Sequence, residues 1–382
     1  MARTPTPSDH PLHRAVRWQS LSTLRRHLAA GADPRAKDVR GLRPLDALSM
    51  ELPDSQDLVI AEELINAMGP TWWRVAKRAL WIAVENDNLD LVRLFIGRGY
   101  RLGYRAHLLH RAVRLDRVAV LPLLTSPQNV NRLDDDGLAP LHHAQSADAV
   151  GTLVDLGGDV HRRSRGGQTP LHRAPTAEVA AALLSRGAEV DAQDRRRQTP
   201  LHLAADRGVA KALLDAGAQI DAQTKAGVTP LLRHTRDDGI RRLLLRAGAD
   251  PDAVDRFGTT PILLAARLGN HRAAHELLAA GADPSVKDRR GRGLGACLAP
   301  WGAHIRERVY TEVLSAAPDY LTGLDDRARL DDALVRALQG LASTGSLQLT
   351  ATQASALLAS GGAALRNAVL RLLPRVHTPD PA

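Results

Sequence analysis

The sequence has few aromatic residues, one cysteine and no long apolar run. Aromatic side chains make up only 3% of the 382 residues, so leucine and alanine must provide the buried surface, as helix-rich repeats allow. A single cysteine, Cys297, excludes an intrachain disulfide framework and a zinc site made of several cysteines. No apolar run approaches about 18 residues, and residues 1–15 lack the apolar core of a signal peptide. We therefore expect a soluble, cytoplasmic protein.

Lysine is also rare, although the chain is strongly basic. The formal net charge is +9, and only five of the 51 cationic residues are lysines. Abundant arginine and alanine are typical of a GC-rich genome, which suggests a bacterial source and requires no selection for binding. The same excess of positive charge would also suit an acidic partner. Bulk composition leaves both interpretations open.

The sequence contains an internal repeat. A proline recurs every 30 or 31 residues, at Pro140, Pro170, Pro200, Pro230 and Pro261. A glycine lies 13 residues before each of the last four, but the distance from a proline to the next glycine varies, from 17 after Pro170 to 20 after Pro261. The shorter units therefore lack three residues that the longest unit has, a length close to one helical turn. We expect the turn between the two helices of a unit to absorb this loss.

The repeated words resemble those of the ankyrin repeat. The segments "TPLHRA" at 169–174 and "TPLHLA" at 199–204 match the word that opens the first helix of that repeat, and "LLSRGAEVDAQD" at 183–194 matches the word that closes the second. The resemblance covers roughly residues 10–293, in about nine units. It implies an all-α solenoid of helix–turn–helix units, each followed by a β-hairpin finger.

The ends of the chain depart from this pattern. Residues 294–320 read as a degenerate capping repeat, which is expected where the outer face of an array meets water. Residues 321–374 have helical periodicity and form either an end cap or a small separate module. We expect residues 1–9 and 375–382 to be disordered tails.

A histidine recurs at the third position of the first helix, at His13, His110, His142, His172 and His202. A catalytic residue is normally unique, whereas a residue repeated in successive units is typical of a scaffold. The third position is where a glutamate or glutamine completes a capping box, so we expect these histidines to cap their helices. His234 departs from the pattern, because it stands where a small alanine normally packs.

Signatures of enzymes and metal sites are weak. His271 and His275 lie one helical turn apart, but Glu276 lies outside the pair and no HExxH motif results. The chain has no phosphate-binding glycine loop and no nucleophile elbow, and the spacing of Cys297 and His304 does not indicate a catalytic pair. We predict no enzymatic activity, metal or cofactor, with an active C-terminal segment as an alternative.

Basic residues recur at the predicted fingertips. Each predicted finger contains an aspartate, or a serine or threonine in its place, just before the fingertip. The residue that follows is cationic in five consecutive fingers, at Arg165, Arg195, Lys225, Arg256 and Arg289. A second, interrupted line follows the recurring histidine position, at Arg14, Arg111, His143, Arg173 and Arg233. In the ankyrin family, fingertips and first helices line the concave binding face. The predicted partner-binding residues are therefore Arg163, Arg165, Arg173, Arg195, Arg196, Arg197, Lys225, Arg233, Arg256, Phe257, Arg289 and Arg290.

The resemblance implies that the partner is a protein, and the charge of the fingertips favours an acidic surface on it, because arginine forks suit carboxylates. Nucleic acid is the alternative, through the phosphate backbone. Phe257 is the one aromatic residue in these basic fingers, which argues against reading single strands by base stacking. We expect a monomer that does not bind membranes.

Overall fold

The computed structural model describes residues 10–49, 55–100, 107–316, 320 and 332–344. The chain divides into two compact units, residues 1–189 and residues 190–382, and each is described by itself. The division falls inside the predicted repeat array. Both predicted tails and most of the predicted C-terminal helical segment lie outside the described residues.

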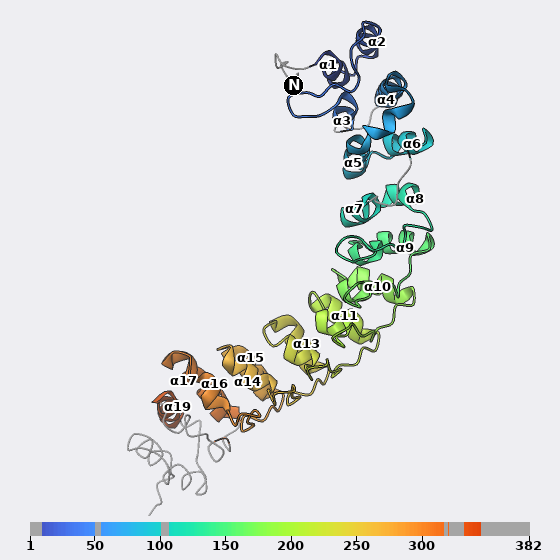
Figure 1. The fold of residues 1–382 in the computed structure, drawn as a ribbon. Coiled ribbons are helices and arrows are strands. Elements are labelled where there is room, and N and C mark those ends of the chain that lie inside the picture. Colours follow the sequence, from blue (N-terminus) through green and yellow to red (C-terminus); the bar gives the residue numbers. More distant parts are fainter. Residues whose placement is uncertain (1–9, 50–54, 101–106, 317–319, 321–331, 345–382) are drawn as a thin grey trace, which may run out of the picture. The chain divides into compact units, whose positions relative to one another are not determined.

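The first unit is a series of helical pairs (Figure 1). Its elements are α1 (Pro11–Arg17), α2 (Leu21–Ala29), α3 (Pro44–Leu48), α4 (Ser55–Met68), η1 (Gly69–Arg74), α5 (Lys77–Glu85), α6 (Leu89–Gly97), α7 (Leu108–Arg114), η2 (Val118–Val120), α8 (Leu121–Leu124), η3 (Pro140–His143), α9 (Ala147–Asp155), η4 (Pro170–Arg173) and α10 (Ala177–Ser185). Helix α3 lies against both α1 and α5, and α5 lies against α7. The first helices of successive pairs therefore pack on one another.

The second unit follows the same plan. Its elements are η5 (Pro200–Leu203), α11 (Arg207–Asp215), α12 (Pro230–Arg233), α13 (Asp238–Arg246), α14 (Pro261–Arg267), α15 (His271–Ala279), α16 (Leu294–Leu298), α17 (Ala303–Ala316) and α19 (Asp332–Ser343). Helix α14 lies against α15 and α16, and α17 lies against α15 and α19. Neither a β-strand nor a helix long and apolar enough to cross a membrane occurs in the described residues.

Local sequence sets where each helix begins and ends. Pro170 stands at the first position of η4, where its missing N–H is no loss. In α10, the hydroxyl of the N-cap Thr176 accepts from the amide of Val179 at 3.4 Å. After α10, Gly187 adopts a φ of 87°, a conformation that glycine tolerates at a helix C-terminus. Each helix is therefore bounded by its own sequence.

The three-residue shortening falls within the first helix of the affected pairs. The first helices α1 and α14 have seven residues, whereas η3, η4 and η5 have four residues each and are 3-10 turns. The three-residue linker and the nine-residue second helix are the same in the long and short forms. The expectation that the inter-helix turn absorbs the loss is therefore wrong. The linker must keep its N-cap residue, and the second helix must keep its buried stripe, such as Val179, Ala180 and Leu183 in α10.

Each finger is a tight turn. In the finger that begins at Asp194, the backbone amide of Asp194 donates to the carbonyl of Gln198 at 3.0 Å. The side chain of Asp194 accepts from the amides of Arg196 and Gln198, both at 2.8 Å. Since the described residues contain no strand, the expected β-hairpin form of the fingers is not confirmed. Most fingers are closed by a glycine with positive φ, at Gly41, Gly137, Gly167, Gly227, Gly258 and Gly291.

Candidate functional site

The recurring histidines belong to the scaffold. In His142, Nδ1 accepts from the amide of Ala139 at 3.1 Å, and Nε2 donates to the carbonyl of Gln168 at 2.9 Å. His202 makes the equivalent bonds to the amide of Thr199 at 3.1 Å and the carbonyl of Val228 at 2.9 Å. The histidine thus takes the place of the glutamate in a capping box and also ties its helical pair to the following finger.

Burial favours the neutral form of His142 and His202. It lowers the pKa of His142 to about 4, and it also lowers the pKa of His202. Because one ring nitrogen of each accepts and the other donates, neither nitrogen is left to act on a substrate. The capping prediction is confirmed for His142, His172 and His202, whose Nδ1 atoms accept from the N-cap amide. It is wrong for His13 and His110, whose buried Nδ1 atoms have no hydrogen-bond partner in the described residues and whose Nε2 atoms alone contact a finger carbonyl.

The other chemical candidates also have structural partners. His234 opens the four-residue linker after α12, at the repeat position of Ala174 and Ala204, and its Nε2 donates to the carbonyl of Leu201 at 3.1 Å. Nδ1 of His275 lies 2.6 Å from a carboxylate oxygen of Glu312, and Cys297 is buried. A search of the described ranges finds no group of three or more side chains suited to hold a metal ion.

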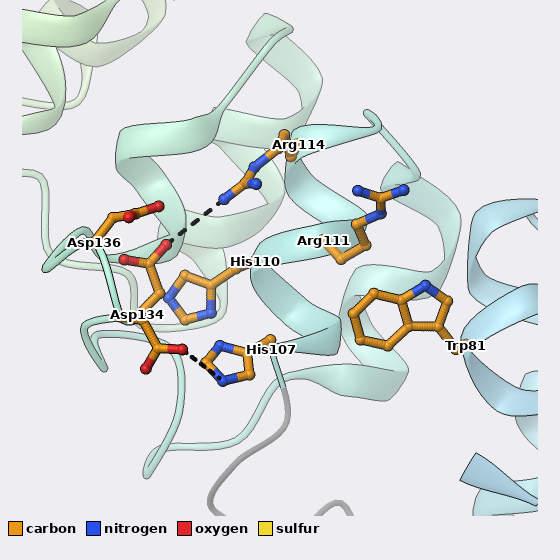
Figure 2. Close-up of a pocket in the computed structure, with 8 residues that line it drawn as sticks. Trp81, His107, His110, Arg111, Arg114, Asp134 and Asp136 are labelled. Carbon is orange, nitrogen blue, oxygen red and sulfur yellow. Dashed lines mark ion pairs between the residues drawn. The ribbon is translucent and has the colours of Figure 1, made fainter. Parts of the chain in front are cut away.

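Figure 2 shows a polar pocket of the first unit that the sequence did not indicate. Oδ2 of Asp134 lies 2.7 Å from Nε2 of His143 and 3.7 Å from Nη2 of Arg114. Burial alone would raise the pKa of Asp134, but the amide of Leu138 and the His143 ring hold it below its usual value. The run of three aspartates at 134–136 does not by itself indicate this pocket, because Arg114 and His143 come from other segments of the chain.

The predicted second basic line is not a uniform row of free cations. Arg14 lies over the ring of Trp18, 5.0 Å from its centroid. Nη2 of Arg111 lies 2.7 Å from a carboxylate oxygen of Glu85, and His143 is buried against Asp134. Arg173 and Arg233 are the members that are exposed and, within the described residues, have neither an ion pair nor an aromatic partner.

Three of the predicted binding residues, Arg163, Arg165 and Arg173, lie in the first unit, and all three are exposed. The amide of Arg165 donates to the carbonyl of Gly137 at 2.9 Å, and its Nη1 donates to the carbonyl of Asp135 at 3.0 Å. Nη1 of Arg163 donates to the carbonyl of Gly167 at 3.0 Å. Backbone carbonyls therefore hold the guanidinium groups of Arg163 and Arg165 on their fingers.

The other nine lie in the second unit and are also exposed: Arg195, Arg196, Arg197, Lys225, Arg233, Arg256, Phe257, Arg289 and Arg290. Backbone bonds join their fingers. The amide of Lys225 donates to the carbonyl of Arg196 at 3.0 Å, that of Arg256 to Ala226 at 2.8 Å, and that of Arg289 to Phe257 at 2.9 Å. Four successive fingertips of this unit are therefore in contact. We call their cations, Arg195, Arg196, Arg197, Lys225, Arg256, Arg289 and Arg290, the fingertip row.

The acidic residues of these fingers do not neutralise the row. Asp194 is buried and accepts from finger amides, as described above. Asp288 accepts from the amides of Arg290 at 2.9 Å and Arg292 at 3.0 Å, and its second oxygen accepts from Nε of Arg292 at 2.8 Å. No ion pair to the side chains of Arg195, Arg196, Lys225, Arg289 or Arg290 occurs in the described part of the chain.

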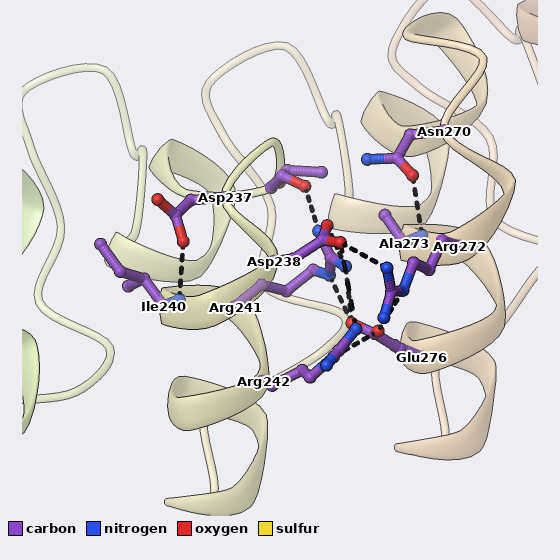
Figure 3. Close-up of polar contacts among 10 residues, drawn as sticks. Asp237, Asp238, Ile240, Arg241, Arg242, Asn270, Arg272, Ala273 and Glu276 are labelled. Carbon is purple, nitrogen blue, oxygen red and sulfur yellow. Dashed lines mark hydrogen bonds and ion pairs between the residues drawn. The ribbon is translucent and has the colours of Figure 1, made fainter. Parts of the chain in front are cut away.

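Some arginines on the second helices form ion pairs. Figure 3 shows Arg241 and Arg242 of α13 converging with Arg272 on Glu276 of α15. Nη2 of Arg241 and Nε of Arg242 each lie 2.6 Å from an oxygen of Glu276. Arg241, Arg242 and Arg272 of this unit therefore share one glutamate.

Two fingertip residues have an unusual conformation or contact. Arg197 has a φ of 59° at the position where the other fingers have glycine, and a non-glycine residue is strained there. Arg256 lies over the ring of Phe257, 4.6 Å from its centroid. The stacked ring orients this guanidinium on an exposed surface. The periodic spacing predicted the position of Arg197 but not its strain.

Comparison with models of protein families identifies the repeats. A model of ankyrin repeats, made of three copies, matches residues 80–194 and again residues 201–288. Together the two ranges cover more than half of the 382 residues. They extend from α5 in the first unit to Asp288, at the base of the finger that carries Arg289 and Arg290.

Proposed function

Because this chain belongs to the ankyrin repeat family, whose repeats are generally protein–protein interaction modules, we propose that it is a scaffold that binds a partner protein along the fingertip row of its second unit. Members of the family are typically non-enzymatic, and binding requires only that side chains be presented in a fixed arrangement. The bonds between successive fingers provide that arrangement, so little conformational entropy is lost on binding.

The observation that carries this proposal is that exposed cations on four successive, hydrogen-bonded fingertips have no acidic partner in the described residues. Arg241 and Arg242 are paired, whereas Arg195, Lys225 and Arg289 are exposed and have no acidic partner in the described residues. Arg197 adds backbone strain at the same surface, and strain of this kind clusters at functional sites.

The proposed partner presents an acidic surface. Guanidinium groups bind carboxylates through paired hydrogen bonds, and a row of cations on successive fingers suits a partner whose carboxylates are similarly spaced. Nucleic acid is the second candidate for the same row, since phosphates would also pair with it. We favour a protein partner because base stacking would require aromatic side chains, and in this row Phe257 is already covered by Arg256.

The test is charge reversal of the row. The full chain and the triple variant Arg195→Glu, Lys225→Glu, Arg256→Glu serve as baits for affinity capture. The matched control reverses three other exposed arginines of the second unit, Arg207, Arg236 and Arg246. A partner captured by the native chain and the control, and lost by the fingertip variant, supports the proposal.

Equal capture by all three baits would refute the role of the row. A second measurement separates the two candidates. Duplex DNA and RNA are titrated at low and high salt, and binding that falls steeply with salt and depends on the same three residues would favour nucleic acid.

A further inference from the structure

A second pocket of the first unit is an open hollow lined by four cations and a tryptophan. It has a volume of about 290 Å³, and the residues that line it are Arg43, Arg74, Val75, Lys77, Arg78 and Trp81. No carboxylate lines it. None of these residues belongs to the predicted partner-binding set, so the pocket has no place in the function proposed above. We call it the Trp81 pocket.

Three segments of the chain bring these cations together. Arg43 is the N-cap of α3, Arg74 ends η1, and Lys77 and Arg78 form the first turn of α5. Trp81 is one turn further along α5, at the position where other first helices have the recurring histidine. Its Nε1 donates to a carboxylate oxygen of Glu85 at 2.8 Å, which fixes the indole as a wall of the pocket.

The charges of the pocket are only weakly compensated. Nη1 of Arg43 lies 3.9 Å from Oδ2 of Asp46, and that oxygen already accepts from the amide of Arg43 at 2.9 Å. Burial raises the pKa of Asp46, and this residue does not line the pocket. The other hydrogen bonds of the cations go to neutral carbonyls, from Arg43 to Val75 at 3.4 Å and from Arg78 to Gly41 at 3.3 Å.

Two further features leave the pocket short of negative charge. Nε of Arg43 is buried and has no hydrogen-bond partner, although an unsatisfied buried donor is costly. The first turn of α5 contains two cations and no acidic residue, and its N-cap Ala76 cannot cap through its side chain. Cations are disfavoured at this end of a helix by the helix dipole. An anion bound beside the first turn of α5 would offset the second feature.

From this geometry we propose that the Trp81 pocket binds a phosphate monoester carried by a partner peptide. A phosphate monoester has a charge near −2 and three acceptor oxygens, which match four convergent cations better than the single charge of one carboxylate. The pocket gathers its cations at one place, whereas a nucleic acid backbone would need a line of cations along its strand. The peptide chain beside the phosphate would pack on the indole of Trp81.

The experiment is calorimetric titration of the full chain with a short peptide of glycine and alanine that carries one phosphoserine. We expect saturable binding of this peptide. A peptide with glutamate in place of the phosphoserine should bind with an affinity lower by about tenfold or more. The peptide with plain serine should not bind. The double variant Arg74→Glu, Lys77→Glu changes two exposed side chains and should abolish binding of the phosphopeptide.

The matched control reverses two exposed arginines of the same unit that lie outside the pocket, Arg26→Glu and Arg162→Glu, and should bind as the native chain does. The fingertip variant of the second unit should also bind normally, so failure of the fingertip proposal leaves this result unaffected. No binding of the phosphopeptide, equal binding of the glutamate and phosphoserine peptides, or tighter binding of a DNA duplex that depends on Arg74 and Lys77, would overturn the proposal.

Discussion

Arg241 of α13 donates two hydrogen bonds to one carboxylate oxygen of Glu276 on α15, from Nε at 2.9 Å and from Nη2 at 2.6 Å, while its own side chain is fully buried. Its Nη1 also donates to the carbonyl of Thr235 at 2.8 Å. One arginine therefore joins two consecutive helical pairs of the second unit and satisfies a buried carbonyl (Figure 3).

Replacing this arginine should destabilise the second unit. We expect Arg241→Ala to lower the free energy of unfolding by about 2–5 kcal/mol, because it leaves a cavity in a buried site and removes the donor to the carbonyl of Thr235. Arg272 contacts the same glutamate but its side chain is 59% exposed, so Arg272→Ala should cost less than about 1 kcal/mol. Hydrogen exchange of the α13 and α15 amides measures both. Equal effects of the two substitutions would contradict the role assigned to burial.

Arg197 should be a site where a glycine stabilises the protein. Its φ of 59° costs an L-residue about 1–2 kcal/mol relative to glycine, although glycine also adds entropy to the unfolded chain. We therefore expect Arg197→Gly to raise the free energy of unfolding by roughly 0.5–1 kcal/mol. Arg195→Gly, two residues earlier in the same finger and without a positive φ, is the control and should not stabilise. Urea denaturation followed by circular dichroism distinguishes them.

The same substitution has a functional consequence. If Arg197 is retained for binding, Arg197→Gly should bind the partner more weakly while unfolding at higher urea. A variant that gains stability and keeps full affinity would show that the strain at this position has no role in binding.

Stability should fall as the pH is lowered below about 6.5. Burial lowers the pKa of His142 to about 4, whereas an unfolded histidine titrates near 6.5. Between these values the unfolded chain binds the proton more strongly, so the stabilisation is complete above pH 6.5 and is lost as the pH falls through the folded value. His142 alone should contribute on the order of 3 kcal/mol to this loss.

The control for this prediction is His142→Gln. A glutamine at the third helical position can still accept the N-cap amide but does not titrate. We expect the variant to be less stable than the native chain at pH 7 and to lose less stability between pH 7 and pH 4. Parallel stability profiles for the two proteins would show that the protonation of His142 does not drive acid unfolding.

Much of the architecture could be predicted from particular words of the sequence. The recurring "TPLH" predicted the first helix and the capping role of histidine, because a proline at the first helical position and an acceptor at the third act within a single turn. The exposure of Arg195, Lys225 and Arg256 also followed from the spacing, since fingertips project beyond the packed helices. The location of the shortening did not follow, because spacing alone does not distinguish a lost helical turn from a lost linker.

The sequence by itself therefore determined the repeat family, the start of the proline-headed first helices and the positions of the basic fingertips, because caps, prolines and glycines act over three or four residues. Only the tertiary structure decided which charges are free. The pairing of Arg241 with Glu276, of Asp134 with His143, and the gathering of Arg43, Arg74 and Lys77 around Trp81 all join residues from different helices or turns. Electrostatic compensation depends on distance in space, and that distance is set by how the repeats stack.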